Sequence, residues 1–285
     1  MPLDVDLLMS RHDDDLRFGY SDREALLYNI SIGMGRDPYA PEERAFVFEL
    51  PELQVVPTFA SILSPRATDL YEGAGIDWTR VVHGEQRITL HRPLPGSAKL
   101  VGSRRVTEVV DKGAEKGALI GTTIEAGLDS GEPLFTCEMV IYARGNGGSG
   151  GSSKSSKDPH VLPERAPDIV HVSETRRDQA LLYRLNGDRN PLHADPDFAK
   201  RAGFPEPILH GLCSYGIACR AVLASVCEYD PARIRQFDVR FSAPVFPGDT
   251  IHTDIWVDGE TVSYRCRVAE RDAVVLNNGR CLLNA

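Results

Sequence analysis

The chain has 285 residues and a mass of 31.4 kDa, which is enough for two domains of average size. Hydrophobic residues make up 42% and charged residues 26% of it, a balance typical of a globular protein with a large core. The formal net charge of −9 argues against nucleic acid as a partner, because binding a polyphosphate needs a basic surface. No apolar run reaches the ~18 residues of a membrane span, so we expect no membrane association.

The ends of the sequence and its cysteines bear on the compartment. The acidic N-terminus does not resemble a secretory signal, and the final Leu-Leu-Asn-Ala is not a peroxisomal address. The six cysteines form no C-x-x-C pair, which favours buried, reduced thiols. We therefore expect a cytoplasmic protein, and a peroxisomal one only if the sequence is an excised domain or its address is missing.

Two similar units are predicted on either side of residues 144–157, whose Gly-, Ser-, Lys- and Arg-rich composition predicts a flexible connector. Each unit has an early helix that contains the same tetrapeptide, Ala-Leu-Leu-Tyr, at 25–28 and at 180–183. The capping patterns Ser21-x-x-Glu24 and Thr175-x-x-Asp178 precede these helices, and Gly33 and Gly187 follow them. We divide the chain into a first unit at 1–143, a Gly/Ser-rich linker at 144–160 and a second unit at 161–285.

Alternating apolar residues predict antiparallel strands later in each unit. They cover about 86–92, 99–110, 118–127 and 134–143 in the first unit, and 237–241, 251–257 and 262–268 in the second. Ser130-Gly131 and Asp258-Gly259 are typical of hairpin turns. The second unit also contains a longer helical stretch at about 211–228, before Pro231. The pattern predicts an α+β protein in which a sheet wraps around a helix.

The residues that can carry chemistry gather in a loop of the second unit. Asp188, Asn190 and His193 follow Gly187, and prolines in the loop oppose a regular helix. Asp188 and His193 could act as acid and base on one water; alternatively, Asp188 caps a turn and His193 packs under the sheet. The equivalent first-unit loop, 33–39, has no Asp–His pair. This asymmetry favours the catalytic interpretation.

A second candidate feature is Leu209-His210-Gly211-Leu212 at the start of the longer helix. A helix N-terminus presents free backbone N–H groups, so Gly211 could donate to a developing oxyanion; alternatively, it only eases the start of the helix. No third ligand accompanies His193 and His210 at a recognisable spacing, so no metal is expected. Cys213 lies in an apolar helix and is expected to be inert.

Residues 183–193, YRLNGDRNPLH, together with 209–212, resemble the signature of the hydratase 2 (MaoC-like) family, which includes the R-specific 2-enoyl-CoA hydratase domain of peroxisomal multifunctional enzyme type 2. The resemblance extends over essentially the whole chain and implies a double hotdog fold. It implies that Asp188 and His193 activate one water for syn addition to trans-2-enoyl-CoA, giving (3R)-3-hydroxyacyl-CoA. It further implies that the Gly211 N–H holds the thioester oxygen and that Asn190 holds the loop.

The same resemblance implies the contacts with substrate. The implied binding residues are His83, Gly84, Lys112, Asp188, Arg189, Asn190, Pro191, Leu192, His193, Gly211 and Phe241. Taken alone, Lys112 could meet a CoA phosphate or be a solvated turn residue, Phe241 could contact the ligand or be core, and His83 would be structural. The resemblance implies a homodimer and a role in fatty acid β-oxidation. No metal or nucleotide cofactor is expected, because the CoA thioester is itself the substrate.

The first unit, which lacks the acid–base pair, is expected to accommodate a long or bulky acyl chain. Fatty, polyhydroxyalkanoate and steroid side-chain thioesters all remain open as substrates. Two other functions also remain open: a hotdog acyl-CoA thioesterase and a non-catalytic acyl-CoA-binding protein.

Overall fold

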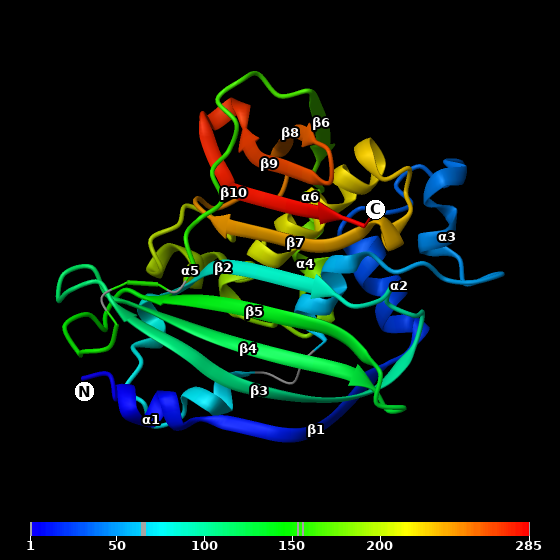
Figure 1. The fold of residues 1–285 in the computed structure, drawn as a ribbon. Coiled ribbons are helices and arrows are strands. Elements are labelled where there is room, and N and C mark those ends of the chain that lie inside the picture. Colours follow the sequence, from blue (N-terminus) through cyan, green and yellow to red (C-terminus); the bar gives the residue numbers. More distant parts are fainter. Residues whose placement is uncertain (1, 64–66, 153, 156, 285) are drawn as a thin grey trace.

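One antiparallel sheet of ten strands organises the described part of the chain, residues 2–63, 67–152, 154–155 and 157–284 of the computed structural model (Figure 1). The strands are β1 His12–Tyr20, β2 Val81–Leu90, β3 Ala98–Asp111, β4 Ala118–Leu128, β5 Pro133–Ala143, β6 Ile169–Glu174, β7 Ile234–Phe241, β8 Thr250–Asp258, β9 Thr261–Val268 and β10 Ala273–Leu283. Their order across the sheet is β1-β3-β4-β5-β2-β7-β10-β9-β8-β6.

This order contains the same arrangement twice. Counted outward from the centre, the first unit runs β2-β5-β4-β3-β1 and the second runs β7-β10-β9-β8-β6, so each strand has a counterpart in the other unit. The antiparallel β2–β7 pair, with Glu85 opposite Arg240 and Thr89 opposite Gln236, joins the two halves. Two tandem units with this topology confirm the expected α+β double hotdog fold.

The helices differ between the units. They are α1 Val5–Ser10, α2 Asp22–Ser31, α3 Arg44–Val47, α4 Gln179–Tyr183, α5 Pro196–Arg201 and α6 Gly211–Val226. The longest, α6, confirms the helix expected at about 211–228 and packs against β6, β7 and β8 of its own unit. No described helix is both long and apolar enough to cross a membrane.

The first unit has no counterpart of α6 among its described residues. Between α2 and β2 lie only α3 and four short 3-10 helices: η1 Pro41–Glu43, η2 Pro57–Ile62, η3 Ala67–Tyr71 and η4 Trp78–Arg80. Prolines recur through this stretch, and each one removes a backbone donor and interrupts a regular helix. Among the described residues, only the second half of the sheet therefore wraps around a long helix, and η2 of the first unit also packs against that helix.

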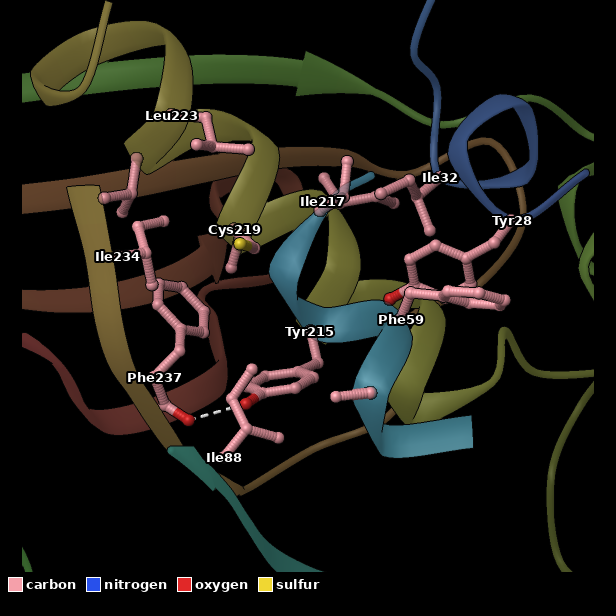
Figure 2. Packing of buried hydrophobic residues seen from close by; sticks show 14 of the residues in the cluster. Tyr28, Ile32, Phe59, Ile88, Tyr215, Ile217, Cys219, Leu223, Ile234 and Phe237 are labelled. Atoms are coloured by element: carbon pink, nitrogen blue, oxygen red, sulfur yellow. Dashed lines mark hydrogen bonds between the residues drawn. The ribbon is translucent and has the colours of Figure 1, made fainter. Parts of the chain in front are cut away.

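Both units contribute to one large apolar core. Figure 2 shows Tyr28, Ile32 and Phe59 of the first unit beside Ile217 of α6. The buried Tyr215 hydroxyl donates to the main-chain oxygen of Phe237 at 2.6 Å, which satisfies its polar atom inside this core. Because the core is shared, neither unit can be removed without exposing the other.

The linker is bound to the first unit rather than free. The Asp111 carboxylate accepts hydrogen bonds from the N–H groups of Gly148 and Gly150 at 2.9 and 3.0 Å. Ser152 forms two main-chain hydrogen bonds with β3, through Val109 and Asp111, each of 2.9 Å. The flexible connector stays a prediction, although β3 supplies partners for the backbone of its described residues; residues 153 and 156 lie outside the described part.

The two predicted helix caps have different outcomes. Glu24 accepts from the Ser21 N–H at 2.9 Å, which confirms the first capping box. The second is wrong, because the Thr175 hydroxyl donates to the main-chain oxygen of Asp249 at 2.7 Å and Asp178 pairs with Arg176 at 2.8 Å. The side chains of Thr175 and Asp178 therefore bind these nearby groups and do not cap the N-terminus of α4.

Candidate active site

The loop that carries the predicted acid–base pair is shaped by its own side chains. It follows η5 (Arg184–Asn186), turns at Gly187 with a φ of +115°, and ends in η6 (Pro191–His193). The Asn190 side-chain oxygen accepts from the Leu192 N–H at 3.0 Å and so caps η6, as its expected role in holding the loop requires. Asp188 Oδ1 accepts from the Asn190 N–H at 3.1 Å.

Asp188 and His193 face each other across a short gap. Asp188 Oδ2 lies 4.0 Å from His193 Nε2. His193 Nδ1 lies 2.8 Å from the main-chain oxygen of Ile208, and because a carbonyl only accepts, Nδ1 carries the proton and Nε2 offers its lone pair. Asp188 caps a turn and His193 is buried, as expected if both residues were only structural. Even so, Asp188 Oδ2 and His193 Nε2 face the same gap.

The surroundings of His193 keep its ring neutral. Burial lowers the pKa of His193 from its ordinary value of 6.5, while the hydrogen bond to Ile208 and the charge of Asp188 act in the opposite direction. Only 10% of its side chain is exposed, whereas 61% of the Asp188 side chain is exposed. A neutral imidazole beside an accessible carboxylate can accept a proton from a bound water.

The N-terminus of α6 lies next to this pair. The His210 ring stacks on the His193 ring with centroids 3.6 Å apart, and Gly211 is the first residue of α6. In the described part of the chain, neither the Gly211 N–H nor the Leu212 N–H has a hydrogen-bond acceptor. A side chain at Gly211 would place its Cβ 3.0 Å from the Phe241 ring, so glycine lets this ring close over the helix start.

The first unit supplies the next part of the site through β2. The rings of His83 and Phe241 lie 4.6 Å apart, and the strand bulges between His83 and Glu85. A Cβ at Gly84 would lie 3.1 Å from the main-chain oxygen of Val140, so this position is tightly packed. Burial lowers the pKa of His83 to about 4, while hydrogen bonds with Glu85 and Gln86 and the charge of Asp188 act in the opposite direction.

Comparison with known proteins shows the family of this chain. A model described as "MaoC like domain" matches residues 160–278, and one described as "MFE-2 hydratase 2 N-terminal domain" matches residues 18–145. The chain belongs to the hydratase 2 (MaoC-like) family. It is 36% identical to the enoyl-CoA hydratase ChsH3 of Mycobacterium tuberculosis, over 98% of each chain.

Two further members of the family resemble it over most of their length. The peroxisomal enoyl-CoA hydratase 2 of Arabidopsis thaliana is 38% identical, over 95% of this chain and 93% of that protein. The crystal structure of a MaoC-like dehydratase from Phytophthora capsici superposes with a TM-score of 0.88 and is 31% identical, over 99% of this chain and 98% of that one.

The expectation that His193 and His210 lack a third potential metal ligand is wrong. One ligand atom each from Asp188, His193 and His210 lie within 4.8 Å of one another. However, an imidazole binds metal in the plane of its ring, and the two rings are stacked with an angle of only 23° between their planes. From this position the two rings are poorly directed toward one shared ion.

The structure brings together most of the predicted site residues and separates one. Those near one another are His83, Gly84, Asp188, Asn190, His193, Gly211 and Phe241. Arg189, Pro191 and Leu192 belong to the same loop. Lys112 lies exposed in the β3–β4 turn, with β4 and β5 between its strand and β2, and no described contact joins it to the Asp188–His193 pair.

His210 is the site residue that sequence reasoning set aside. From the sequence, His210 is interpreted only as a potential metal ligand. Its position directly before Gly211 was the available signal, because a residue that starts the helix must lie beside any ligand held there.

Proposed function

We propose that this chain is a type 2 enoyl-CoA hydratase that reversibly adds water to trans-2-enoyl-CoA and forms (3R)-3-hydroxyacyl-CoA. The observation that carries the proposal is the gap of 4.0 Å between Asp188 Oδ2 and His193 Nε2, beside the free N–H of Gly211. Relatives 36% and 38% identical over nearly the whole chain carry the name enoyl-CoA hydratase. Such a reaction is a step of fatty acid β-oxidation.

The gap between the two side chains suits one water molecule. A water oxygen about 2.8 Å from each can donate one proton toward His193 Nε2 and the other toward the Asp188 carboxylate. As its oxygen bonds to C3 of the substrate, one water proton passes to the pair and the C2–C3 π electrons move toward the thioester. The pair then returns that proton to C2 on the same face, so both parts of the water add syn.

The start of α6 would stabilise the intermediate. Electrons that leave the double bond collect on the thioester oxygen as an enolate, and a free N–H at a helix N-terminus stabilises such a charge. Gly211 offers that N–H one residue after His210, whose ring stacks on His193. The acid–base pair and the oxyanion donor are thus available to the same substrate.

Hydration balances without an electron carrier, so we propose that the reaction uses no metal or nucleotide cofactor. The stacked rings of His193 and His210 support this, because they are poorly directed for a shared metal ion. Dialysis against a chelator should leave the rate unchanged, and a loss of activity that zinc restores would contradict the proposal.

We further propose that the acyl chain extends toward the first unit. The side chains that Figure 2 labels on α6 and η2 are hydrophobic, although the buried Thr58 of η2 is polar. The described residues of the first unit form only short helices there. These side chains are closely packed, so a long chain must displace some of them. A series from crotonyl-CoA to decenoyl-CoA tests this, and acceptance of crotonyl-CoA alone would contradict it.

The decisive experiment follows the loss of enoyl absorbance with trans-2-enoyl-CoA, combined with chiral analysis of the product. A hydratase gives the 3-hydroxyacyl-CoA with no new thiol, and the (3R) enantiomer is expected. A thioesterase would instead release free CoA that a thiol-reactive dye detects. A non-catalytic binding protein would bind the thioester and leave the absorbance constant. Either of these last two results would refute the proposal.

We also propose a cytoplasmic homodimer. The six cysteines are all free and buried, which is compatible with a reducing compartment. Light scattering after gel filtration tests the dimer, and cell fractionation tests the compartment.

A further inference from the structure

His210 lies between the parts of the site that must act together. It is 2% exposed, and its ring stacks on His193 at 3.6 Å and packs beside Tyr183, with those centroids 5.0 Å apart. Its main-chain oxygen accepts from the N–H groups of Cys213 and Ser214, so it also forms the start of α6. One residue therefore touches the base and precedes the oxyanion donor.

The same side chain also holds the carboxylate loop. His210 Nε2 lies 3.1 Å from the main-chain oxygen of Asp188. A carbonyl only accepts, so Nε2 carries the proton and donates it to Asp188. His193 has the opposite tautomer, with its proton on Nδ1 toward Ile208. The His210 ring therefore holds the loop backbone through its Nε2–H, while the His193 ring keeps the lone pair of its Nε2 free to accept a proton.

His210 is suited to this task because it stays neutral. Burial and the neighbouring His193 lower its pKa to about 4, and the charge of Arg184 acts the same way, whereas Asp188 opposes them. In the described part of the chain its Nδ1 is buried without a partner. A buried nitrogen without a hydrogen-bond partner lowers the stability of the folded state. An apolar side chain would therefore fill this position better, unless the Nε2–H of His210 is needed to hold Asp188.

We propose that His210 is a positioning residue of the hydratase: its Nε2–H holds the Asp188 main chain so that the Asp188 carboxylate, His193 Nε2 and the Gly211 N–H keep one mutual arrangement. The proposal rests on the proposed function. It requires no contact between His210 and substrate, and it predicts that the donor at this position matters more than the aromatic ring.

The test compares two substitutions that differ in the donor. In His210→Gln the side-chain amide reaches about as far as Nε2 and can still donate to Asp188, whereas His210→Met has a similar volume and no donor. We expect kcat to fall about 10- to 100-fold in H210M, as displaced catalytic groups commonly cause, with KM within about threefold of the wild type. H210Q should keep kcat within about threefold.

A matched control is His171→Met. His171 is a half-buried histidine on β6 whose Nδ1 contacts the Ser225 hydroxyl at 3.2 Å, and it lies outside the proposed machinery. We expect unchanged kcat in H171M. Equal losses in H210Q and H210M, or near wild-type kcat in a folded H210M, would overturn the proposal.

A second readout does not depend on activity. Nitrogen-15 spectra of the histidines should show His210 protonated on Nε2 and His193 on Nδ1. Relaxation dispersion should detect new microsecond-to-millisecond motion at the loop amides, including Asn190, in H210M but not in H210Q. An unchanged loop in H210M, or a His210 protonated on Nδ1, would refute the positioning role even if the chain proved not to be a hydratase.

Discussion

The loops that follow the repeated Ala-Leu-Leu-Tyr helices show how the two units have diverged. Both loops begin at a glycine in the left-handed region, with φ of +100° at Gly33 and +115° at Gly187. After Gly187 the polar side chains face an accessible gap. After Gly33, Met34 is buried, and the Gly35 N–H donates to the buried Glu43 carboxylate at 2.7 Å.

The first-unit loop is used to join the units. Arg36 donates to the main-chain oxygen of Glu174 and, at 2.8 Å, to the Gln179 side-chain oxygen, both in the second unit. Arg220 of α6 donates to Glu43 at 2.8 Å. The first-unit loop therefore forms an inter-unit contact, while the second-unit loop leaves its polar groups available for chemistry.

The strongest test removes the chemistry of the second loop while preserving its hydrogen bonds. Asp188→Asn keeps an oxygen that can accept from Asn190, and His193→Asn keeps a donor near the position of Nδ1 for Ile208. We expect each variant to lower kcat at least ~100-fold, because each removes one member of the acid–base pair. Steady-state kinetics on an enoyl-CoA measures this.

Thermal unfolding supplies the control for these variants. D188N should unfold at nearly the wild-type temperature because Asp188 is largely exposed. A near wild-type rate in either folded variant would show that the two loops do not differ in chemistry and would refute the assignment.

A smaller effect is expected at the helix start. In Gly211→Ala the N–H remains, but the new Cβ would lie 3.0 and 3.1 Å from two Phe241 ring atoms. The ring or the helix must shift, so we expect kcat to fall about 10-fold, as misplacement of an oxyanion donor allows. Gly211→Ala combined with Phe241→Leu should recover part of the loss. A double variant no better than G211A would show that this contact does not position the donor.

The sequence predicts the strands and the proximity of Asp188 and His193 well, because both depend on local patterns. Strict alternation reveals β3, β4, β5, β8 and β9. It does not reveal β10, where Asn277-Asn278-Gly279 interrupts the pattern; Asn278 takes a φ of +54° where the pairing shifts register. Composition also cannot show that Asp111 binds the linker backbone.

The remaining site residues depend on contacts between distant segments. His83 contacts Phe241 because β2 pairs with β7, and no local sequence pattern predicts this pairing. Only the family resemblance indicates that the two residues belong to one site. His210 stacks on His193 although residues 194–209, which include α5, lie between them in the sequence. Such long-range contacts require coordinates.

The pH dependence of activity should come from the second loop, since the first has no imidazole. Burial lowers the pKa of His193, so kcat/KM should decline only below pH 6.5 rather than at it. Stability should decline in the same direction, because His83 and His210 each have a folded pKa of about 4 against 6.5 when unfolded. Between these values the unfolded chain binds more protons. Urea midpoints that do not decrease from pH 6.5 to 4 would contradict this.

The smallest effect is expected in the first loop. Arg36→Gln removes the hydrogen bonds to Glu174 and Gln179 and should lower the free energy of unfolding by about 1 kcal/mol, since the guanidinium is exposed and water replaces part of the interaction. Because this loop joins the units and carries no chemistry, kcat should stay within about twofold of the wild type. The matched control is Arg23→Gln on α2, which should change neither value, because Arg23 is exposed and forms no hydrogen bond or ion pair in the described part of the chain. If R36Q instead lowered kcat at unchanged stability, the first loop would have a part in the reaction, and the division of roles between the two loops would fail.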